Sequence, residues 1–224
     1  MGRSLPNSSS GIIHEEKLQV NGQEWIVYAV SGSPAQAVLH AVLEIMPQKP
    51  DVIVSGINYG ENVGLGVTIS GTVGAAMEGA SLGFPALAVS LEADQRYHLS
   101  YSDEVDFSAA AYFTEYFARL LLNENMPEDV QVLKVDVPSD ATTKTAWQVT
   151  RVARQRYYEP VRPERKSWDA PGVVSYKEAA ILDGEDKDSD VFALRKKRTV
   201  SVTPISLDMT SRIELANLEK RLRQ

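Results

Sequence analysis

The chain has 224 residues, of which 43% are apolar and 24% charged, and its formal net charge is −7. It holds no cysteine and three histidines, which excludes disulfide scaffolds, cysteine-ligated metals and cysteine nucleophiles and argues against a histidine-rich zinc site. The acidic balance is unsuited to wrapping duplex DNA, so nucleic acid is not an expected partner.

Neither a membrane span nor a secretory leader is expected. No stretch approaches the roughly 18 consecutive apolar residues that a spanning helix requires. Residues 1–11 are rich in Ser, Gly, Pro and Asn, which is typical of a loop rather than of the apolar core of a signal peptide. We therefore expect a cytoplasmic protein that does not contact membranes.

Residues 12–30 predict a β-hairpin, and the residues after it predict the start of a helix. Two apolar, β-branched runs flank Asn21-Gly22, a dipeptide that supplies the positive φ angles of a type I′ turn. Downstream, Ser33 is a suitable N-cap and Pro34 a suitable first helical residue.

Helices and strands alternate through the first two thirds of the chain, which predicts an α/β layered domain. Two of the early strands are short and nearly all apolar, as in a parallel sheet buried on both faces. The predicted helices cover residues 35–46, 73–82, 106–123 and 211–222, and the predicted strands cover residues 51–56, 86–90, 130–137, 146–152 and 199–205.

Residues 153–190 predict a protruding arm, either extended or a β-hairpin, followed by an acidic loop. Prolines interrupt any long element there, and arginines alternate with Tyr157, Tyr158 and Trp168. Such aromatic and guanidinium groups can stack on single-stranded nucleic acid. An arm that contacts another subunit is the alternative interpretation. Because no linker divides the chain, we expect one domain over residues 1–224 that carries this arm.

A glycine-rich loop at residues 56–69 is the most informative segment. It follows a buried strand and leads into Ser70-Gly71-Thr72, which opens a helix. The first N–H groups of a helix are unpaired and its dipole is positive there, so this helix start is a candidate anion site. The loop matches neither the P-loop nor the dinucleotide-binding fingerprint.

Two amides, Asn58 and Asn62, lie in the same loop. An amide oxygen can ligate a hard cation such as Mg²⁺, and an amide nitrogen can donate to phosphate. A plain connection, with glycines that serve packing and a serine that only caps a helix, explains the same residues, and the residues by themselves leave both interpretations open.

Several segments carry a family resemblance: residues 49–60 (KPDVIVSGINYG), 70–79 (SGTVGAAMEG) and 85–90 (PALAVS), supported by 32–35 (GSPA), 149–151 (VTR) and 200–204 (VSVTP). Together they resemble the SurE family of metal-dependent 5′/3′-nucleotidases over nearly the whole chain. The resemblance implies a Rossmann-like three-layer α/β/α sandwich with a C-terminal oligomerisation extension. It also implies a nucleoside monophosphate substrate and a homodimer or homotetramer.

The resemblance implies a role for each candidate residue of the loop. Asn58 matches the family's asparagine ligand of a divalent metal, with Mg²⁺ or Mn²⁺ expected. Asn62 matches a second active-site asparagine that contacts phosphate or a metal-bound water. Ser70, Gly71 and Thr72 match the phosphate-binding helix start. The implied reaction is metal-assisted hydrolysis of nucleoside 5′- or 3′-monophosphates to nucleoside and phosphate.

The sequence departs from the family pattern at the other metal ligands. The family begins with a strand that ends in Asn-Asp-Asp-Gly, whose aspartates bind the metal, and no Asp-Asp pair occurs here. The stretch that ends in Ser4 is similar to the segment just after the family's ligating serine, and Ser4 is itself an alternative ligand. The comparison implies an N-terminally incomplete domain with its catalytic side chains unassigned, with no activity or very weak activity, and with low stability. A catalytically impaired phosphate- or nucleotide-binding protein that still oligomerises is the alternative function.

The three histidines receive no catalytic role. His98 lies in a polar loop after a strand, where an exposed side chain is preferred over a general acid. His40 is expected to pack within its helix, and His14 lies on the hairpin.

Overall fold

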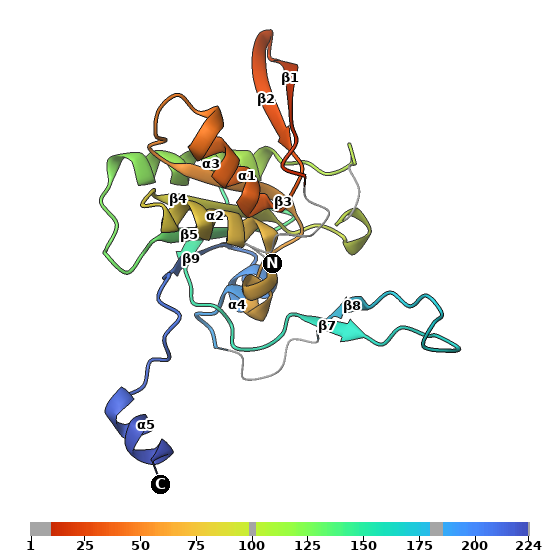
Figure 1. Cartoon of the computed structure of the whole chain (residues 1–224), viewed down its shortest axis with the longest axis vertical. Coiled ribbons are helices and arrows are strands. Elements are labelled where there is room, and N and C mark those ends of the chain that lie inside the picture. The colour runs from red at the N-terminus through yellow and green to blue at the C-terminus, as the bar shows by residue number, and fades with distance from the viewer. Residues whose placement is uncertain (1–9, 99–101, 180–185, 224) are drawn as a thin grey trace.

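A computed structural model describes residues 10–98, 102–179 and 186–223, and a five-stranded sheet forms its centre (Figure 1). Ser4 lies outside the described residues. The strands are β3 (Ile53–Tyr59), β4 (Ala86–Leu91), β5 (Val132–Val137), β6 (Trp147–Val149) and β9 (Val200–Ile205). Their order is β3-β4-β5-β9-β6, in which β3, β4 and β5 run parallel to one another, and β9 and β6 run parallel to each other in the opposite direction.

Helices cover both faces of this sheet (Figure 1). One face carries α1 (Pro34–His40), extended by the π-helical turn η1 (Ala41–Ile45), and α2 (Gly71–Ser81). The opposite face carries α3 (Ser108–Asn123). Further helical elements in the body of the molecule are η2 (Gly64–Ile69), η3 (Gln95–Tyr97) and α4 (Asp190–Arg195). The predicted Rossmann-like α/β/α sandwich is therefore confirmed.

Alternate residues of each strand build the two halves of the apolar core. In β4 the large side chains pack against α3, whereas Ala86 and Ala88 face α2. The close packing of α2 against β3 also needs a glycine at position 79, because a Cβ at Gly79 would lie 2.6 Å from Cδ1 of Ile53. The small residues of α2 and β4 thus set the spacing between helix and sheet.

One stretch of β5 is polar although it is fully buried. Lys134 and Asp136 alternate with the apolar residues of the strand, and their side chains are 0% exposed. The Lys134 ammonium contacts Asp136 and lies 3.1 Å from Oδ2 of Asp190, which opens α4 and is equally buried. We call Lys134, Asp136 and Asp190 the buried triad.

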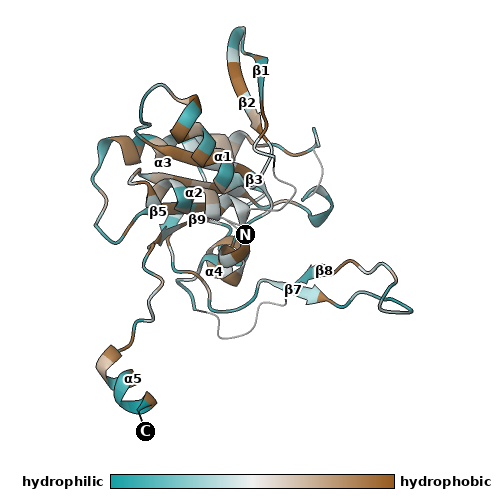
Figure 2. Cartoon of the chain, viewed as in Figure 1, coloured by the Kyte–Doolittle hydropathy of each residue, from teal (hydrophilic) through white to brown (hydrophobic). Residues whose placement is uncertain are grey.

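Three segments project from the body of the molecule (Figure 1). They are the hairpin of β1 (Ile13–Val20) and β2 (Gln23–Val30), the arm that contains β7 (Tyr158–Val161) and β8 (Ser175–Glu178), and the terminal helix α5 (Leu215–Leu222). Figure 2 shows that all three mix apolar and polar residues along their length. No helix among the described residues is both long and apolar enough to cross a membrane.

Most predicted elements are present, but some bounds differ. The predicted hairpin turn is confirmed by positive φ angles at Asn21 and Gly22. The strand expected over residues 146–152 is shortened to β6, because the chain then leaves the sheet toward α4 through a single bridge between Arg151 and Ser189. The predicted terminal helix begins four residues late, at Leu215.

Candidate active site

A cavity of about 590 Å³ opens at the carboxyl end of β3, where ligands of open α/β sheets bind. The five predicted phosphate- and metal-binding residues all line it: Asn58, Asn62, Ser70, Gly71 and Thr72. Residues 56–72, which carry them, are called the loop wall. The opposite side is called the arm wall and is formed by His98, Tyr158 and Tyr176. The structure therefore brings the predicted residues together, while their individual roles stay predictions.

Asn58 reaches the cavity because β3 bends sharply just before it. Gly56 has φ +124°, and a Cβ at this position would lie 2.3 Å from the Val89 carbonyl oxygen of β4. The register of the two strands shifts between Ser55 and Asn58. A glycine is thus required for β3 to cross so close to β4 and to turn Asn58 toward the cavity.

The Asn58 amide is oriented by its own loop. Its Nδ2 donates to the Gly60 carbonyl at 2.7 Å and to the Tyr59 carbonyl at 3.3 Å. Within the described residues, its Oδ1 has no hydrogen-bond partner. The oxygen that could ligate a hard cation is therefore the free atom of this amide.

Asn62 is held at two points by buried side chains of the sheet. Its backbone N–H donates to Oδ1 of Asp136 at 2.8 Å, and its Nδ2 donates to Oγ of Ser90 at 2.7 Å. One amide hydrogen is therefore committed to Ser90. The second hydrogen and Oδ1 remain for a ligand in the cavity.

The buried triad fastens the loop wall at a third point. Oδ2 of Asp190 accepts the Gly64 N–H at 3.1 Å, and Oδ1 of Asp190 accepts the Ala153 N–H at 2.9 Å. Burial alone opposes a charge on Lys134, but the flanking carboxylates outweigh burial and hold the pKa of Lys134 above its ordinary value. The loop thus rests on a charged, hydrogen-bonded support.

The start of α2 presents unpaired backbone donors to the cavity. Oγ of Ser70 accepts the Val73 N–H at 3.1 Å and so caps the helix. The N–H groups of Gly71 and Thr72 have no partner within the helix. Together with the positive end of the helix dipole, these groups form an anion site of the kind predicted from the sequence.

Glu61 is a carboxyl group that sequence reasoning missed. It lies between the two site asparagines, is 4% exposed and lines the cavity wall. Burial raises the pKa of Glu61, and the neighbouring Tyr157 and Tyr158 hydroxyls offset part of this rise. A glutamate side chain in a glycine-rich loop is normally exposed to solvent, so the sequence gives no sign that Glu61 is buried.

The arm wall consists of three aromatic rings in mutual contact, of which His98 and Tyr176 are stacked and Tyr158 meets both edge-on. The Tyr158 and Tyr176 ring centroids lie 5.1 Å apart, and the His98 and Tyr176 rings are nearly parallel at 6.1 Å. Nδ1 of His98 lies 3.0 Å from the Tyr176 hydroxyl. The expectation of an exposed His98 is therefore wrong, because the arm folds back over the loop that carries this residue.

The described residues do not by themselves fit a divalent metal. No group of three or more His, Cys, Asp or Glu side chains in the described ranges is placed to hold an ion. Asn58 is neutral, and the carboxylates of the buried triad are already paired with Lys134. Mg²⁺ usually needs one or two carboxylates together with water and substrate phosphate, so Asn58 alone is insufficient.

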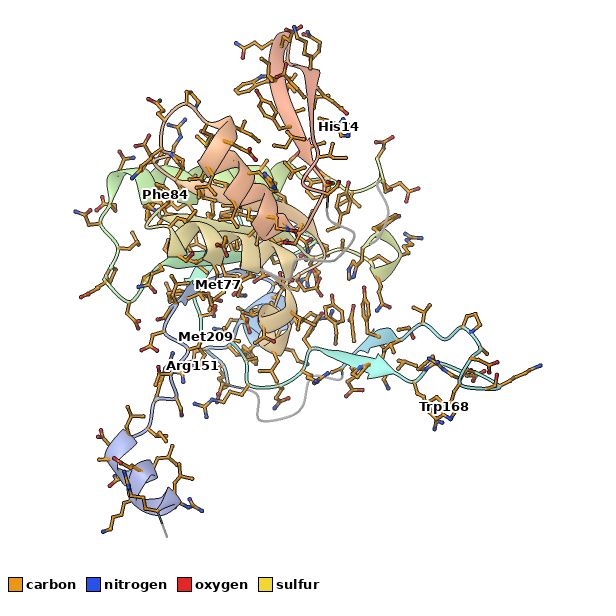
Figure 3. The ribbon with its side chains drawn as sticks, in the orientation of Figure 1. His14, Met77, Phe84, Arg151, Trp168 and Met209 are labelled. Atoms are coloured by element: carbon orange, nitrogen blue, oxygen red, sulfur yellow. The ribbon has the colours of Figure 1, made fainter. Side chains whose placement is uncertain are left out.

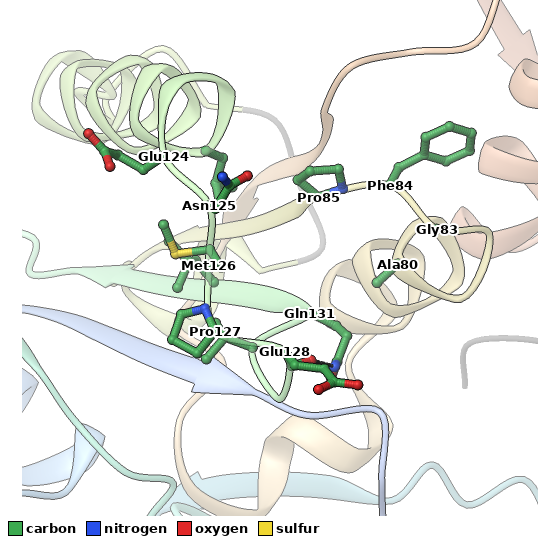
Figure 4. Close-up of a pocket in the computed structure, with 13 residues that line it drawn as sticks. Ala80, Gly83, Phe84, Pro85, Glu124, Asn125, Met126, Pro127, Glu128 and Gln131 are labelled. Carbon is green, nitrogen blue, oxygen red and sulfur yellow. Dashed lines mark hydrogen bonds between the residues drawn. The ribbon is translucent and has the colours of Figure 1, made fainter.

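A second, smaller cavity of about 290 Å³ lies at the other end of the sheet (Figure 4). Its wall runs from the end of α2 to the connection between α3 and β5, and it includes Glu124, Met126 and Glu128. This is the amino end of the parallel strands and it carries acidic side chains. It is therefore unsuited to phosphate, and the larger cavity is the candidate site.

Comparison with known proteins gives the same picture in sequence and in fold. The sequence matches the family described as survival protein SurE over residues 4–159. The 5′-nucleotidase SurE of Thermococcus gammatolerans is 39% identical over 94% of this chain and 77% of that protein. The protein of the same name from Thermococcus kodakarensis is 37% identical over 88% of this chain and 74% of its own length.

A solved structure extends the likeness to three dimensions. The SurE protein from Aquifex aeolicus superimposes with a TM-score of 0.68 at 26% sequence identity. The match covers 100% of this chain and 84% of that one, so it includes the sheet, both helix layers and the arm.

Proposed function

The chain belongs to the SurE family, and from that premise we propose that it hydrolyses nucleoside 5′- or 3′-monophosphates to nucleoside and phosphate. The observation that carries the proposal is the cavity itself. It gathers the open helix start at Gly71 and Thr72 with Asn58 and Asn62 at the carboxyl end of β3. The name 5′-nucleotidase, borne by the relatives, supports hydrolysis over the alternative of a protein that only binds nucleotides.

The residues of the loop wall bind and orient the phosphoryl group. The N–H groups of Gly71 and Thr72 donate to its oxygens, and Ser70 holds the helix start in place. Asn62 adds its free amide hydrogen while Ser90 fixes the orientation of the amide. Charge that develops on the phosphoryl oxygens meets donors that are already in position, so little reorganisation is needed at the transition state.

Phosphate release from adenosine monophosphate by the full chain tests this proposal. Asn62→Ala should lower kcat/KM about a hundredfold, the usual effect of losing one such donor. Ser81→Ala is the matched control, because Ser81 donates to the Glu78 carbonyl at the far end of α2 and does not line the cavity. No release of phosphate by the unaltered chain, or an equal loss in both variants, would contradict the proposal. The ratio of kcat/KM between the two variants is the decisive quantity.

A divalent cation, Mg²⁺ or Mn²⁺, belongs to the same proposal through the family resemblance. When bound, such an ion would polarise the phosphoryl oxygen and orient a water. Because the described residues do not fit the ion by themselves, we derive no step through it. Calorimetric titration of Mn²⁺ into the chain and into Asn58→Ala tests whether Asn58 takes part. Equal affinity in the two proteins would remove Asn58 from the ligand set.

We further propose a homodimer or homotetramer built through the projecting segments. In β2, Trp25 is 55% exposed and Ile26 is 52% exposed, and α5 exposes Leu215 and Leu222. Apolar side chains gathered on projecting elements are typical of contact surfaces. Light scattering should give the mass of two or four chains, and Leu215→Lys with Leu222→Lys should lower it. A monomer at micromolar concentration would contradict the proposal. The cytoplasmic location stays a prediction.

A further inference from the structure

The cavity has two chemically different sides, and the proposed hydrolysis uses one of them. The loop wall supplies amide and backbone donors for a phosphoryl group. The arm wall supplies aromatic rings, together with Pro160 and Val174 of the arm. A phosphate ion alone would fill a small part of a volume of about 590 Å³. The remainder lies within the range of small-molecule sites, which are typically apolar with a few convergent polar groups.

The rings of the arm wall are fixed in place before any ligand arrives. Tyr176 is held through its hydroxyl by Nδ1 of His98 at 3.0 Å and through its carbonyl oxygen by Nε2 of Gln95 at 2.7 Å. Nevertheless, 37% of Tyr176 remains exposed. A positioned and partly exposed ring costs little conformational entropy when another ring packs on it.

The arm wall directly adjoins the loop that carries the two asparagines. A Cβ on Gly60 would lie 2.6 Å from Nε2 of His98, so the imidazole packs against the backbone between Asn58 and Asn62. A single small molecule can therefore touch both walls. Arg156 also lines the cavity and has no ion pair within the described residues, which adds a positive charge for an anionic ligand.

We propose that Tyr158 and Tyr176 form the subsite that binds the nucleobase of the substrate by ring stacking. The phosphate lies at the start of α2 while the base packs on the tyrosines. This inference rests on the proposed function and adds the residues that select a nucleoside monophosphate over other phosphate esters. A bounded cavity fits one nucleotide better than a continuous strand, so single-stranded nucleic acid is not the occupant that the geometry favours.

Two phosphate esters that differ by the base test the subsite. Adenosine 5′-monophosphate and ribose 5-phosphate share the sugar and the phosphate, and ribose 5-phosphate lacks the ring. Tyr176→Ala should raise the KM for adenosine monophosphate about ten- to a hundredfold relative to that for ribose 5-phosphate, with little change in kcat. Tyr176→Phe keeps the ring and should restore the preference. Tyr112→Ala, a partly exposed tyrosine on α3, is the matched control.

Equilibrium binding of adenosine monophosphate separates this inference from the proposed function. Weaker binding by Tyr176→Ala, with affinity retained in Tyr176→Phe, supports the subsite even if no phosphate is released. Unchanged binding by Tyr176→Ala overturns it even if the chain hydrolyses both esters. A similar loss for both esters would also overturn it, because the tyrosine would then support the fold rather than the base.

Discussion

The two walls of the cavity are held by different means. The loop wall is bonded to Ser90, Asp136 and Asp190, whose side chains belong to the buried interior. The arm wall is held by ring contacts and by hydrogen bonds near the surface, and beyond it the arm extends to Trp168, which is 90% exposed (Figure 3). The residues proposed for phosphate therefore share the stability of the core, whereas those proposed for the base do not.

Because the two walls are held differently, phosphate binding should be coupled to the stability of the fold, whereas the choice of substrate should not. A change in the support of the loop wall should disturb folding and phosphate binding together, because the same bonds serve both. A change in the arm should alter the choice of substrate at little cost in stability. Variants of Asp190, Ser90 and Trp168 test this separation, and a variant of Glu92, which belongs to neither wall, serves as a reference.

Asp190→Ala should have the largest effect, about 3–5 kcal/mol, because it removes one charge from a fully buried group and leaves its partners unpaired. The matched control is Asp188→Ala, whose pair with Arg151 is exposed and contributes about 0.2–1 kcal/mol. Urea denaturation measures both. If Asp190→Ala does not fold, Asp190→Asn, which keeps an acceptor, should give an intermediate loss. Equal losses at positions 188 and 190 would contradict the role of the buried triad.

Glu92→Gln should cause the second-largest loss in the free energy of unfolding, and the size of this loss should depend on pH. Glu92 follows β4 and accepts from Arg198 at 2.6 and 2.9 Å and from Ser139 at 2.9 Å. Burial favours the neutral acid, but these donors outweigh it and hold the pKa of Glu92 below its ordinary value. Charged hydrogen bonds of this kind contribute about 1.5–3 kcal/mol at neutral pH.

The sign of the pH dependence follows from the lowered pKa. A carboxyl group that is more acidic in the folded state stabilises the fold above its unfolded pKa, and this contribution is lost as the pH falls through the folded pKa. The difference in unfolding free energy between the two proteins should thus be largest near pH 7 and shrink in acid. A constant difference would show that Glu92 acts through packing. Glu159→Gln, at an exposed pair with Lys177, is the control.

Ser90→Ala should cost about 0.5–1.5 kcal/mol, because the Asn62 amide loses its acceptor at a half-buried site. It should also lower kcat, since the free amide hydrogen is no longer held toward the cavity. Thermal unfolding and phosphate release are measured on the same preparation, with Ser81→Ala beside it. A loss of stability without a loss of rate would mean that the orientation of Asn62 is irrelevant to the reaction.

Trp168→Ala should have the smallest effect, within about 0.5 kcal/mol, because an exposed side chain at the arm's far end supports no core contact. Activity toward adenosine monophosphate should remain as well. A clear fall in the unfolding midpoint would indicate that the arm tip is packed against another subunit, and repeating the measurement at several protein concentrations would reveal it.

Local chemistry explains which features could be predicted. Asn21-Gly22 determines a tight hairpin turn, and Ser70 determines a helix start, because each acts on the backbone within a few residues. The five candidate site residues lie on one continuous segment that runs from the end of β3 to the start of α2, so this segment alone was sufficient to find them. Their chemical roles depend on the family resemblance and stay predictions.

The features that sequence reasoning missed depend on distant parts of the chain. Lys134 and Asp136 alternate with apolar residues, a pattern that indicates one polar strand face, and such a face is usually exposed to solvent. Their burial results from α4, which follows more than fifty residues later. Tyr158 was recognised from the sequence as an aromatic residue of the arm, but Tyr176 was not, because the arm tip separates the two and only the antiparallel pairing of β7 and β8 brings them together.

The bond between Gly64 and Asp190 spans 126 positions of the chain. During synthesis on the ribosome, the loop with its two asparagines therefore emerges long before the residue that fastens it. Asp136 arrives in between, 74 positions after Asn62. The nascent chain can form its early helices and strands in order of emergence, but the proposed phosphate-binding segment becomes fixed only after Asp190 has been made.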